Sequence, residues 1–174
     1  MKPANIILVG FMGAGKSICG RMLARRTGRC FVETDDMIVA REGRTIPDIF
    51  RQDGEERFRQ LEGEVLEDLT LKNGNVIATG GGLPCREGRM ESLKSLGTVV
   101  WLDGDFRELH DRASRTSDRP MLTGRTLAEV EALYRQRTAF YRQAHLIIDT
   151  TGLAIDEVVS RVLRALRDSH SART

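Results

Sequence analysis

Apolar residues along the chain gather in five short runs that are separated by longer amphipathic stretches. The runs cover residues 6–9, 30–32, 76–78, 98–102 and 146–148. Continuous apolar runs of this length are typical of strands buried on both faces of a parallel sheet. Alternation of such strands with helices implies a parallel sheet that helices cover on both faces. At 174 residues the chain fits a single α/β domain, 1–174.

The stretches between these runs predict helices. The expected helical regions are 17–27, 37–71, 86–95, 105–114, 126–144 and 155–166. Glycines at 43 and 54 predict two breaks in the long region 37–71. Thr126 and Glu129 match a capping box, which marks the start of the fifth region.

Three segments carry more specific expectations. In the first helix, Ile18, Cys19, Met22 and Leu23 share one stripe, which we expect to face the core. Residues 115–125 have no apolar periodicity and contain Gly124, Pro120 and three arginines, which predicts a mobile loop. We expect the tail 168–174 to fray.

The composition is that of an ordinary globular protein, with 40% hydrophobic and 30% charged residues. A formal net charge of +2 is too small to indicate a nucleic-acid partner, although arginines gather between residues 107 and 142. The three cysteines lack metal-ligand spacing and predict reduced thiols. The first residues contain no apolar run long enough to span a membrane. We therefore expect a cytoplasmic monomer that binds neither membrane nor nucleic acid.

Residues 10–17, GFMGAGKS, match the pattern G-x-x-x-x-G-K-[ST] between the first strand and the first helix. In that context the glycines let backbone N–H groups surround a phosphate, and Lys16 adds a mobile charge. The hydroxyl of Ser17 can bind Mg²⁺. The expected nucleotide contacts are Gly13, Ala14, Gly15, Lys16, Ser17 and Ile18. A glycine-rich turn with a chance lysine would not require the flanking strand and helix, so we predict a nucleoside triphosphate site.

Two further clusters follow predicted strands, at the edge where open α/β sheets bind ligands. The acidic cluster 33–36 follows the second strand, and the triple glycine 80–82 follows the third. Acidic residues are also favoured at a helix N-terminus, which remains an alternative for 33–36. The triple glycine indicates either close approach of a ligand to the backbone or a flexible turn.

Arginines supply the remaining candidates. Arg137 shares one helical face with Val130, Tyr134 and Tyr141. An arginine on an apolar face indicates a bound carboxylate or phosphate, unless its side chain extends to solvent. Arg59 lies at the edge of an apolar stripe, a common position, and can pair with Glu62. Arg119, in the predicted loop, is either solvated or part of a lid that closes over phosphates.

Together these motifs resemble the shikimate kinase family over residues 5–167. The matching pieces are GFMGAGKS at 10–17, Thr34-Asp35, the segment 53–62, the triple glycine, Arg119-Pro120-x-Leu122 and Arg137-x-x-x-Tyr141. The resemblance implies a three-layer P-loop NTPase fold with a five-stranded parallel sheet of order 2-3-1-4-5. It also implies ATP- and Mg²⁺-dependent transfer of the γ-phosphate to the 3-hydroxyl of shikimate, in the pathway to chorismate and aromatic amino acids.

The same resemblance implies roles for single residues. Asp35 would bind the shikimate hydroxyls and act as catalytic base. The shikimate-binding residues would be Asp35, Arg59, Gly80, Gly81, Gly82 and Arg137. Lys16 and Arg119 would neutralise the transferring phosphoryl group, and Arg112 would lie against adenine. Residues 36–61 would form the substrate-binding helical region, and 115–125 the lid.

The sequence departs from the family pattern at two positions. Glu33 stands where an aspartate is usual, which leaves its water-mediated contact to Mg²⁺ in question. Ile18 replaces a frequent threonine, so that only its backbone N–H remains to bind phosphate. Another small P-loop metabolite kinase, of the gluconate type, is the alternative function. A catalytically silent relative would be expected to lack Lys16, Asp35 or Arg119, and all three are present.

Overall fold

The computed structural model describes residues 4–115 and 122–171 and contains a five-stranded parallel sheet of order β2-β3-β1-β4-β5. The strands are β1 (Asn5–Val9), β2 (Cys30–Glu33), β3 (Asn75–Ala78), β4 (Gly97–Asp103) and β5 (Leu146–Asp149). Each apolar run of the sequence thus forms one strand. The predicted sheet and its strand order are confirmed.

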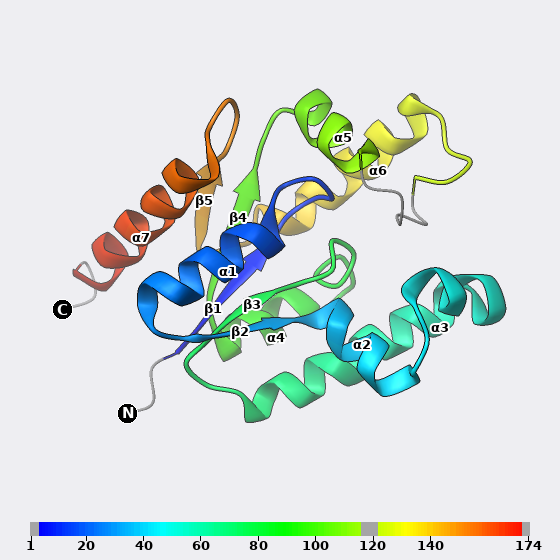
Figure 1. Ribbon diagram of the computed structural model, residues 1–174, viewed down its shortest axis with the longest axis horizontal. Coiled ribbons are helices and arrows are strands. Elements are labelled where there is room, and N and C mark those ends of the chain that lie inside the picture. Colours follow the sequence, from blue (N-terminus) through cyan, green and yellow to red (C-terminus); the bar gives the residue numbers. More distant parts are fainter. Residues whose placement is uncertain (1–3, 116–121, 172–174) are drawn as a thin grey trace.

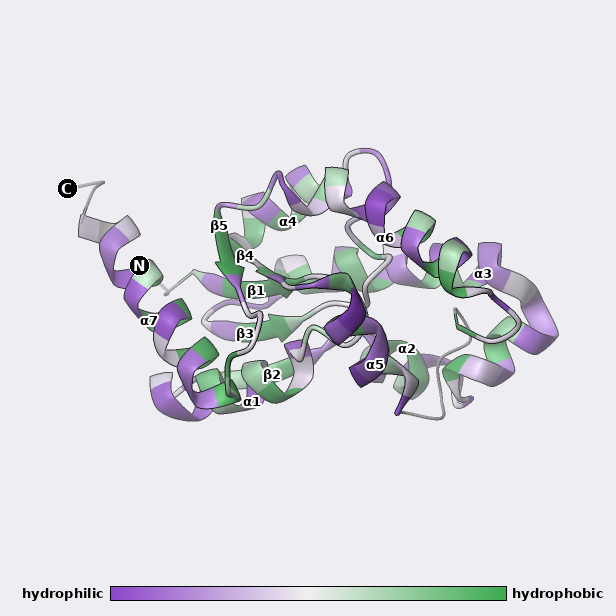
Figure 2. Cartoon of the chain, turned by 90° about the horizontal axis from the view of Figure 1, so that it is seen from above, coloured by the Kyte–Doolittle hydropathy of each residue, from purple (hydrophilic) through white to green (hydrophobic). Residues whose placement is uncertain are grey.

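Helices connect the strands and cover both faces of the sheet (Figures 1 and 2). They are α1 (Lys16–Thr27), α2 (Thr34–Glu42), α3 (Ile46–Asp68), α4 (Arg89–Leu96), α5 (Phe106–Ser114), α6 (Leu127–Tyr141) and α7 (Ile155–Ser171), with a short 3-10 helix at Leu69–Leu71. Helices α1 and α7 pack against each other on one face, and Figure 2 shows α4 across the sheet from α1. None of the described helices is long and apolar enough to cross a membrane.

Apolar side chains form two separate clusters. The large cluster surrounds the central strand β1, where Ile7, Leu8 and Val9 are fully buried. This agrees with the continuous apolar runs, because both faces of the central strand are covered. The small cluster lies between α2 and α3 and consists of Ile38, Ile49, Phe58, Leu61 and Val65. Helices α2 and α3 therefore form an arm beside the sheet, with a core of its own (Figure 1).

Glycines end or break helices where the sequence predicts it. Gly43 closes α2 with φ 65°, and Gly54 interrupts α3 with φ 81° and ψ 174°. The capping box at Thr126 and Glu129 is present at the start of α6. The three cysteines are free thiols, as expected.

Some element ends differ from the prediction. Helix α4 begins at Arg89 and not at residue 86, because the preceding residues form turns that follow the triple glycine. Helix α6 ends at Tyr141 and not near residue 144. The expectation of a frayed tail from residue 168 was wrong as far as Ser171, since α7 continues to that residue.

Candidate active site

The loop of residues 10–15 joins β1 to α1 at the carboxyl edge of the sheet. Gly13 has φ 80°, and a Cβ there would stand 2.1 Å from the carbonyl oxygen of Leu109 in α5, so a side chain has no room. The Lys16 ammonium donates to the carbonyl oxygens of Gly10 at 2.8 Å and Phe11 at 3.0 Å. Among the described residues no side chain caps the N-terminus of α1. This end of the helix therefore offers its N–H groups and partial positive charge to an anion.

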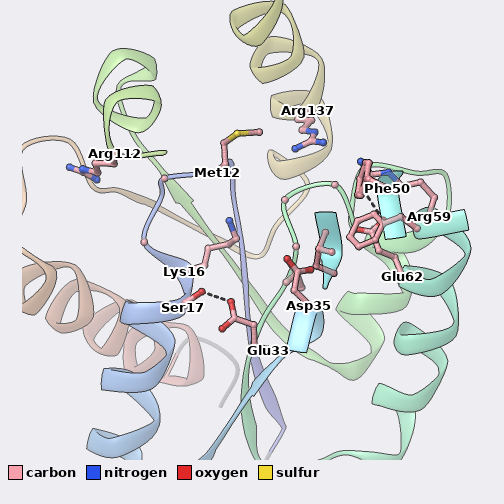
Figure 3. Close-up of a pocket in the computed structure, with 18 of the residues that line it drawn as sticks. Met12, Lys16, Ser17, Glu33, Asp35, Phe50, Arg59, Glu62, Arg112 and Arg137 are labelled. Carbon is pink, nitrogen blue, oxygen red and sulfur yellow. Dashed lines mark hydrogen bonds and ion pairs between the residues drawn. The ribbon is translucent and has the colours of Figure 1, made fainter. Parts of the chain in front are cut away.

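A pocket of about 490 Å³ extends from this loop to the arm of α2 and α3 (Figure 3). Thirteen of the residues named from the sequence line it: Gly13, Gly15, Lys16, Ser17, Ile18, Glu33, Asp35, Arg59, Gly80, Gly81, Gly82, Arg112 and Arg137. Ala14 belongs to the same loop, but it is buried and is not part of the lining. Arg119 lies outside the described residues, as does most of the predicted lid. The structure thus brings together at one pocket nearly all candidates that it describes.

Ile18 corrects one expectation about α1. Its side chain is 56% exposed and borders the pocket, whereas Cys19 and Leu23 are fully buried. Ile18 lies in the first turn of α1, directly after the loop. At this point the helix borders the pocket and not the core. The stripe predicted for 17–27 therefore begins one residue later, at Cys19.

The acidic cluster 33–36 divides between two roles. Glu33 ends β2 and accepts a hydrogen bond from the Ser17 hydroxyl through Oε1 and one from Arg21 through Oε2 at 3.2 Å (Figure 3). Asp35 lies in the first turn of α2 and also lines the pocket, while Asp36 is exposed. Asp36 therefore fits the helix-start interpretation alone, whereas Glu33 and Asp35 line the pocket.

Two carboxylate oxygens in this pocket are buried and lack a hydrogen-bond partner among the described residues: Asp35 Oδ1 and Glu62 Oε1. Both approach Gly80, since a Cβ on Gly80 would stand 2.7 Å from Asp35 Oδ1 and 3.4 Å from Glu62 Oε1. Burial, reinforced by the negative charge of Glu62, raises the pKa of Asp35 to about 6, although Lys16 opposes the shift. An unpartnered, partly ionised carboxylate in a pocket is poised to accept a proton from a ligand.

Glu62 organises the cationic end of the pocket. Its Oε2 accepts from Arg59 Nη1 at 2.9 Å and from Arg89 Nη1 at 3.3 Å, and Arg59 also pairs with Glu55 at 2.9 Å. The predicted pair of Arg59 and Glu62 is confirmed. Arg89 was missed, because it comes from α4, and no spacing within the sequence connects it to a helix that ends twenty residues earlier. The wall beside Arg59 is apolar, formed by Ile46, Phe50 and Phe58, and sequence reasoning gave only the region that holds them.

Arg137 lies on the inward face of α6, as its spacing predicted, and is only 5% exposed. Its guanidinium lies 5.7 Å from the ring centre of Phe11, and none of the described carboxylates forms an ion pair with it. The alternative that the side chain extends to solvent is therefore wrong. A buried guanidinium without a counter-ion is costly, so its environment favours binding of an anion.

Arg112 lies at the other end of the pocket, on α5 (Figure 3). Its Nη2 donates to Glu108 at 2.9 Å, and the same Glu108 oxygen accepts from the N–H of Gly152 at 3.2 Å. One carboxylate thus fixes Arg112 against the loop between β5 and α7. The pocket has a phosphate-binding loop and an arginine at one end, two arginines at the other and Asp35 between them, which is a geometry suited to transfer of a phosphoryl group.

Comparison with known proteins agrees with this geometry. The model of the shikimate kinase family matches residues 12–167. The shikimate kinase of Symbiobacterium thermophilum is 43% identical over 168 residues, which cover 94% of this chain and 97% of that protein. The shikimate kinase of Acinetobacter baumannii, solved in complex with shikimate, superimposes with a TM-score of 0.90 at 36% identity over 96% of this chain and 94% of that one. The shikimate kinase of Aquifex aeolicus superimposes with a TM-score of 0.83 at 36% identity, over 95% of this chain and 98% of that one. The chain belongs to the shikimate kinase family.

Proposed function

We propose that this protein is a shikimate kinase that transfers the γ-phosphate of ATP to the 3-hydroxyl of shikimate, in the pathway to chorismate. The observation that carries the proposal is the buried Arg137, which has no ion pair with a carboxylate of the described residues and shares one pocket with Arg59, Asp35 and the phosphate-binding loop. A small hydroxylated carboxylate fits this end, because arginine binds carboxylates in a paired geometry. Family membership and the shikimate-bound relative support the assignment over a gluconate-type kinase.

At the nucleotide end, the N–H groups of residues 13–18 bind the phosphates, and Lys16 moves from its carbonyl partners to the transferring group. Arg112 lies against adenine. Arg119, outside the described residues, supplies the second cation that neutralises the transferring phosphoryl group. Phosphoryl transfer depends mainly on positioning and on positive charge around a loose transition state, which these groups supply.

The family uses ATP with Mg²⁺, and the residues here fit that ion. Ser17 Oγ and Glu33 Oε1 are hard oxygen donors that already contact each other beside the phosphate loop. They would hold Mg²⁺, Glu33 through water, and such a water would compensate for the longer reach of the Glu33 side chain. When bound, the ion neutralises phosphate charge.

At the substrate end, Arg59 and Arg137 hold the carboxylate, and the backbone of Gly80, Gly81 and Gly82 lies against the ring. Asp35 accepts the proton of the attacking hydroxyl. Its pKa of about 6 leaves it mostly ionised at neutral pH, yet basic enough to take a proton. We propose a monomer that acts in the cytoplasm.

The test is a coupled assay of ADP release. Purified protein with MgATP is offered shikimate, quinate, gluconate and nucleoside monophosphates in parallel. We expect shikimate-dependent release to exceed the release with gluconate or the monophosphates by at least a hundredfold. Equal turnover of gluconate and shikimate would refute the assignment and leave the alternative of another metabolite kinase.

A further inference from the structure

A second cavity, of about 300 Å³, lies behind the substrate end of the pocket, between α3, the turn after the triple glycine and α6. Four arginines line it: Arg59, Arg86, Arg125 and Arg137. Glu55 is the one carboxylate in its described lining. Arg59, Gly82 and Arg137 also line the first pocket, but the proposed phosphoryl transfer places no ligand in this second cavity.

The positive charge of the cavity is only partly balanced. Arg59 pairs with Glu55 and Glu62, and Arg86 pairs with Glu56 at 2.8 Å. Neither Arg125 nor Arg137 forms an ion pair with any carboxylate of the described residues. Glu129 interacts electrostatically with Arg125, and Tyr141 forms a hydrogen bond with Arg137, but neither group lines the cavity. The described lining therefore has more positive than negative charge, which favours an anionic occupant.

Part of the cavity wall is apolar, so a ligand must also cover apolar surface. Leu133, Arg137 and Phe140 fall on one face of α6, and all three line the cavity. One cation is thus flanked by two apolar side chains. The thiol of Cys85, also in the lining, stays protonated and neutral, since burial raises its pKa to about 11. An inorganic anion would leave the apolar wall uncovered, whereas a small organic carboxylate would cover both kinds of surface.

The two cavities share a thin wall made of Gly82, Arg59 and Arg137. A Cβ on Gly81 would stand 3.2 Å from Arg137 Nη1, and a Cβ on Gly82 would stand 2.2 Å from Arg59 Nη1. Gly82 and the two guanidinium-bearing side chains thus line both cavities, which places Arg137 at the boundary between them.

We propose that the second cavity is a binding site for a small organic carboxylate with an apolar body, held by Arg125 and Arg137. Its occupation opposes binding of substrate, because both ligands draw on the charge of Arg137. By linkage, each ligand weakens the other by the same factor. The binding itself is independent of the proposed function, whereas the antagonism rests on it.

The first experiment measures benzoate binding by calorimetry at constant ionic strength. We expect benzoate to bind the parent protein, and Arg125→Ala to weaken it at least fivefold. Arg125 is exposed, so its removal does not threaten folding. Arg135→Ala is the matched control: Arg135 lies on α6, is 76% exposed, pairs with Glu131 and does not line the cavity, so benzoate affinity should not change. Acetate and benzyl alcohol, which lack the apolar body or the charge, should each bind at least tenfold more weakly.

Absence of benzoate binding, or equal affinity in the parent and Arg125→Ala, would overturn the site. Equal affinity would place benzoate in the first pocket. The second experiment measures shikimate affinity by calorimetry with and without saturating benzoate. A several-fold loss in the parent that disappears in Arg125→Ala supports the antagonism, and an unchanged affinity refutes it. A protein that binds benzoate through Arg125 but does not bind shikimate would keep the site and remove the proposed function.

Discussion

The sheet and the arm of α2 and α3 hold the two ends of the active site by different means. The nucleotide loop is seated on the large core around β1, where whole strands are buried. The substrate end rests on the small core of Ile38, Ile49, Phe58, Leu61 and Val65. Around it, half-exposed ion pairs connect α2 to α3, such as Arg41 with Glu64 and Arg57 with Glu42.

The difference bears on how the site responds to ligands. Exposed ion pairs each contribute little, about 0–1 kcal/mol, so the arm depends on its five apolar side chains. Regions with few buried apolar contacts open at lower free energy than the rest of a protein. We therefore expect the nucleotide loop to be preformed, and the substrate end to adjust by movements of the arm.

The largest effect, on the free energy of unfolding, should come from replacing one buried leucine by alanine in each of the two cores. Leu8 and Leu61 are both fully buried, one in each cluster. Leu8→Ala should lower the free energy of global unfolding by about 3–5 kcal/mol, and Leu61→Ala by about 2–3 kcal/mol. Urea titration measures both. Hydrogen exchange should show faster opening across α2 and α3 alone in Leu61→Ala, and uniform acceleration over the whole chain would remove the distinction between the cores.

A second effect separates substrate binding from nucleotide binding. Arg137→Ala should weaken shikimate binding by about 2–4 kcal/mol, the size of losing a buried charge-assisted contact, and leave ATP affinity unchanged. Calorimetry with each ligand tests this, with Arg135→Ala as a control that should change neither. If Arg137→Ala abolished ATP binding and spared shikimate, the two ends would be assigned the wrong way round.

The third prediction concerns Asp35, where the two ends meet. Because its folded pKa of about 6 lies above the unfolded value, the ionised form destabilises the fold, and stability is lost as the pH rises through this range. Asp35→Asn resembles the protonated form. It should raise the free energy of unfolding by about 1–3 kcal/mol at pH 8, with no gain at pH 4. It should also abolish most turnover while shikimate still binds.

Denaturant titrations at the two pH values, together with kcat, give the readout for Asp35→Asn. The kcat/KM of the parent should fall as the pH drops through about 6, because the base becomes protonated. A variant less stable than the parent at pH 8 would show that the carboxylate is not strained by burial.

The smallest effect should be at Glu33, within the nucleotide end. Glu33→Asp should keep most activity, whereas Glu33→Gln should raise the Mg²⁺ concentration for half-maximal rate several-fold, about 1 kcal/mol. Neither change should alter shikimate affinity. A magnesium titration of both variants beside the parent decides it. An unmoved midpoint in Glu33→Gln would exclude Glu33 from the metal site.

Features that depend on local sequence were predictable. Each strand followed from an apolar run, and the nucleotide loop followed from its motif with the flanking strand and helix. The inward face of Arg137 followed from helical spacing. The strand order came from the family resemblance, because no local pattern specifies which strands are neighbours. The role of Arg112 and the individual roles of the substrate-binding residues also came from the resemblance.

What the sequence did not reveal depends on contacts between distant elements. Ile18 faces the pocket because the first turn of α1 follows the phosphate-binding loop and borders the pocket. Apolar periodicity alone cannot predict this orientation. The start of α4 moved because the turns after the triple glycine extend to residue 88. Arg89 meets Glu62 only after α3 and α4 have packed, so neither its burial nor its partner could be read from spacing.

The single carboxylate oxygen that Arg59 and Arg89 share has a consequence for how this enzyme can evolve. Loss of Glu62 alone would leave Arg59 with Glu55 as its one carboxylate partner among the described residues and Arg89 with none, while loss of either arginine leaves the other to balance Glu62. The effects of these three residues therefore cannot add, and the fitness of a change at one depends on the other two. We expect the three residues to be substituted in one order only during evolution, with an arginine replaced first and Glu62 last. Such epistasis, more than any single contact, would keep the substrate end of the pocket unchanged.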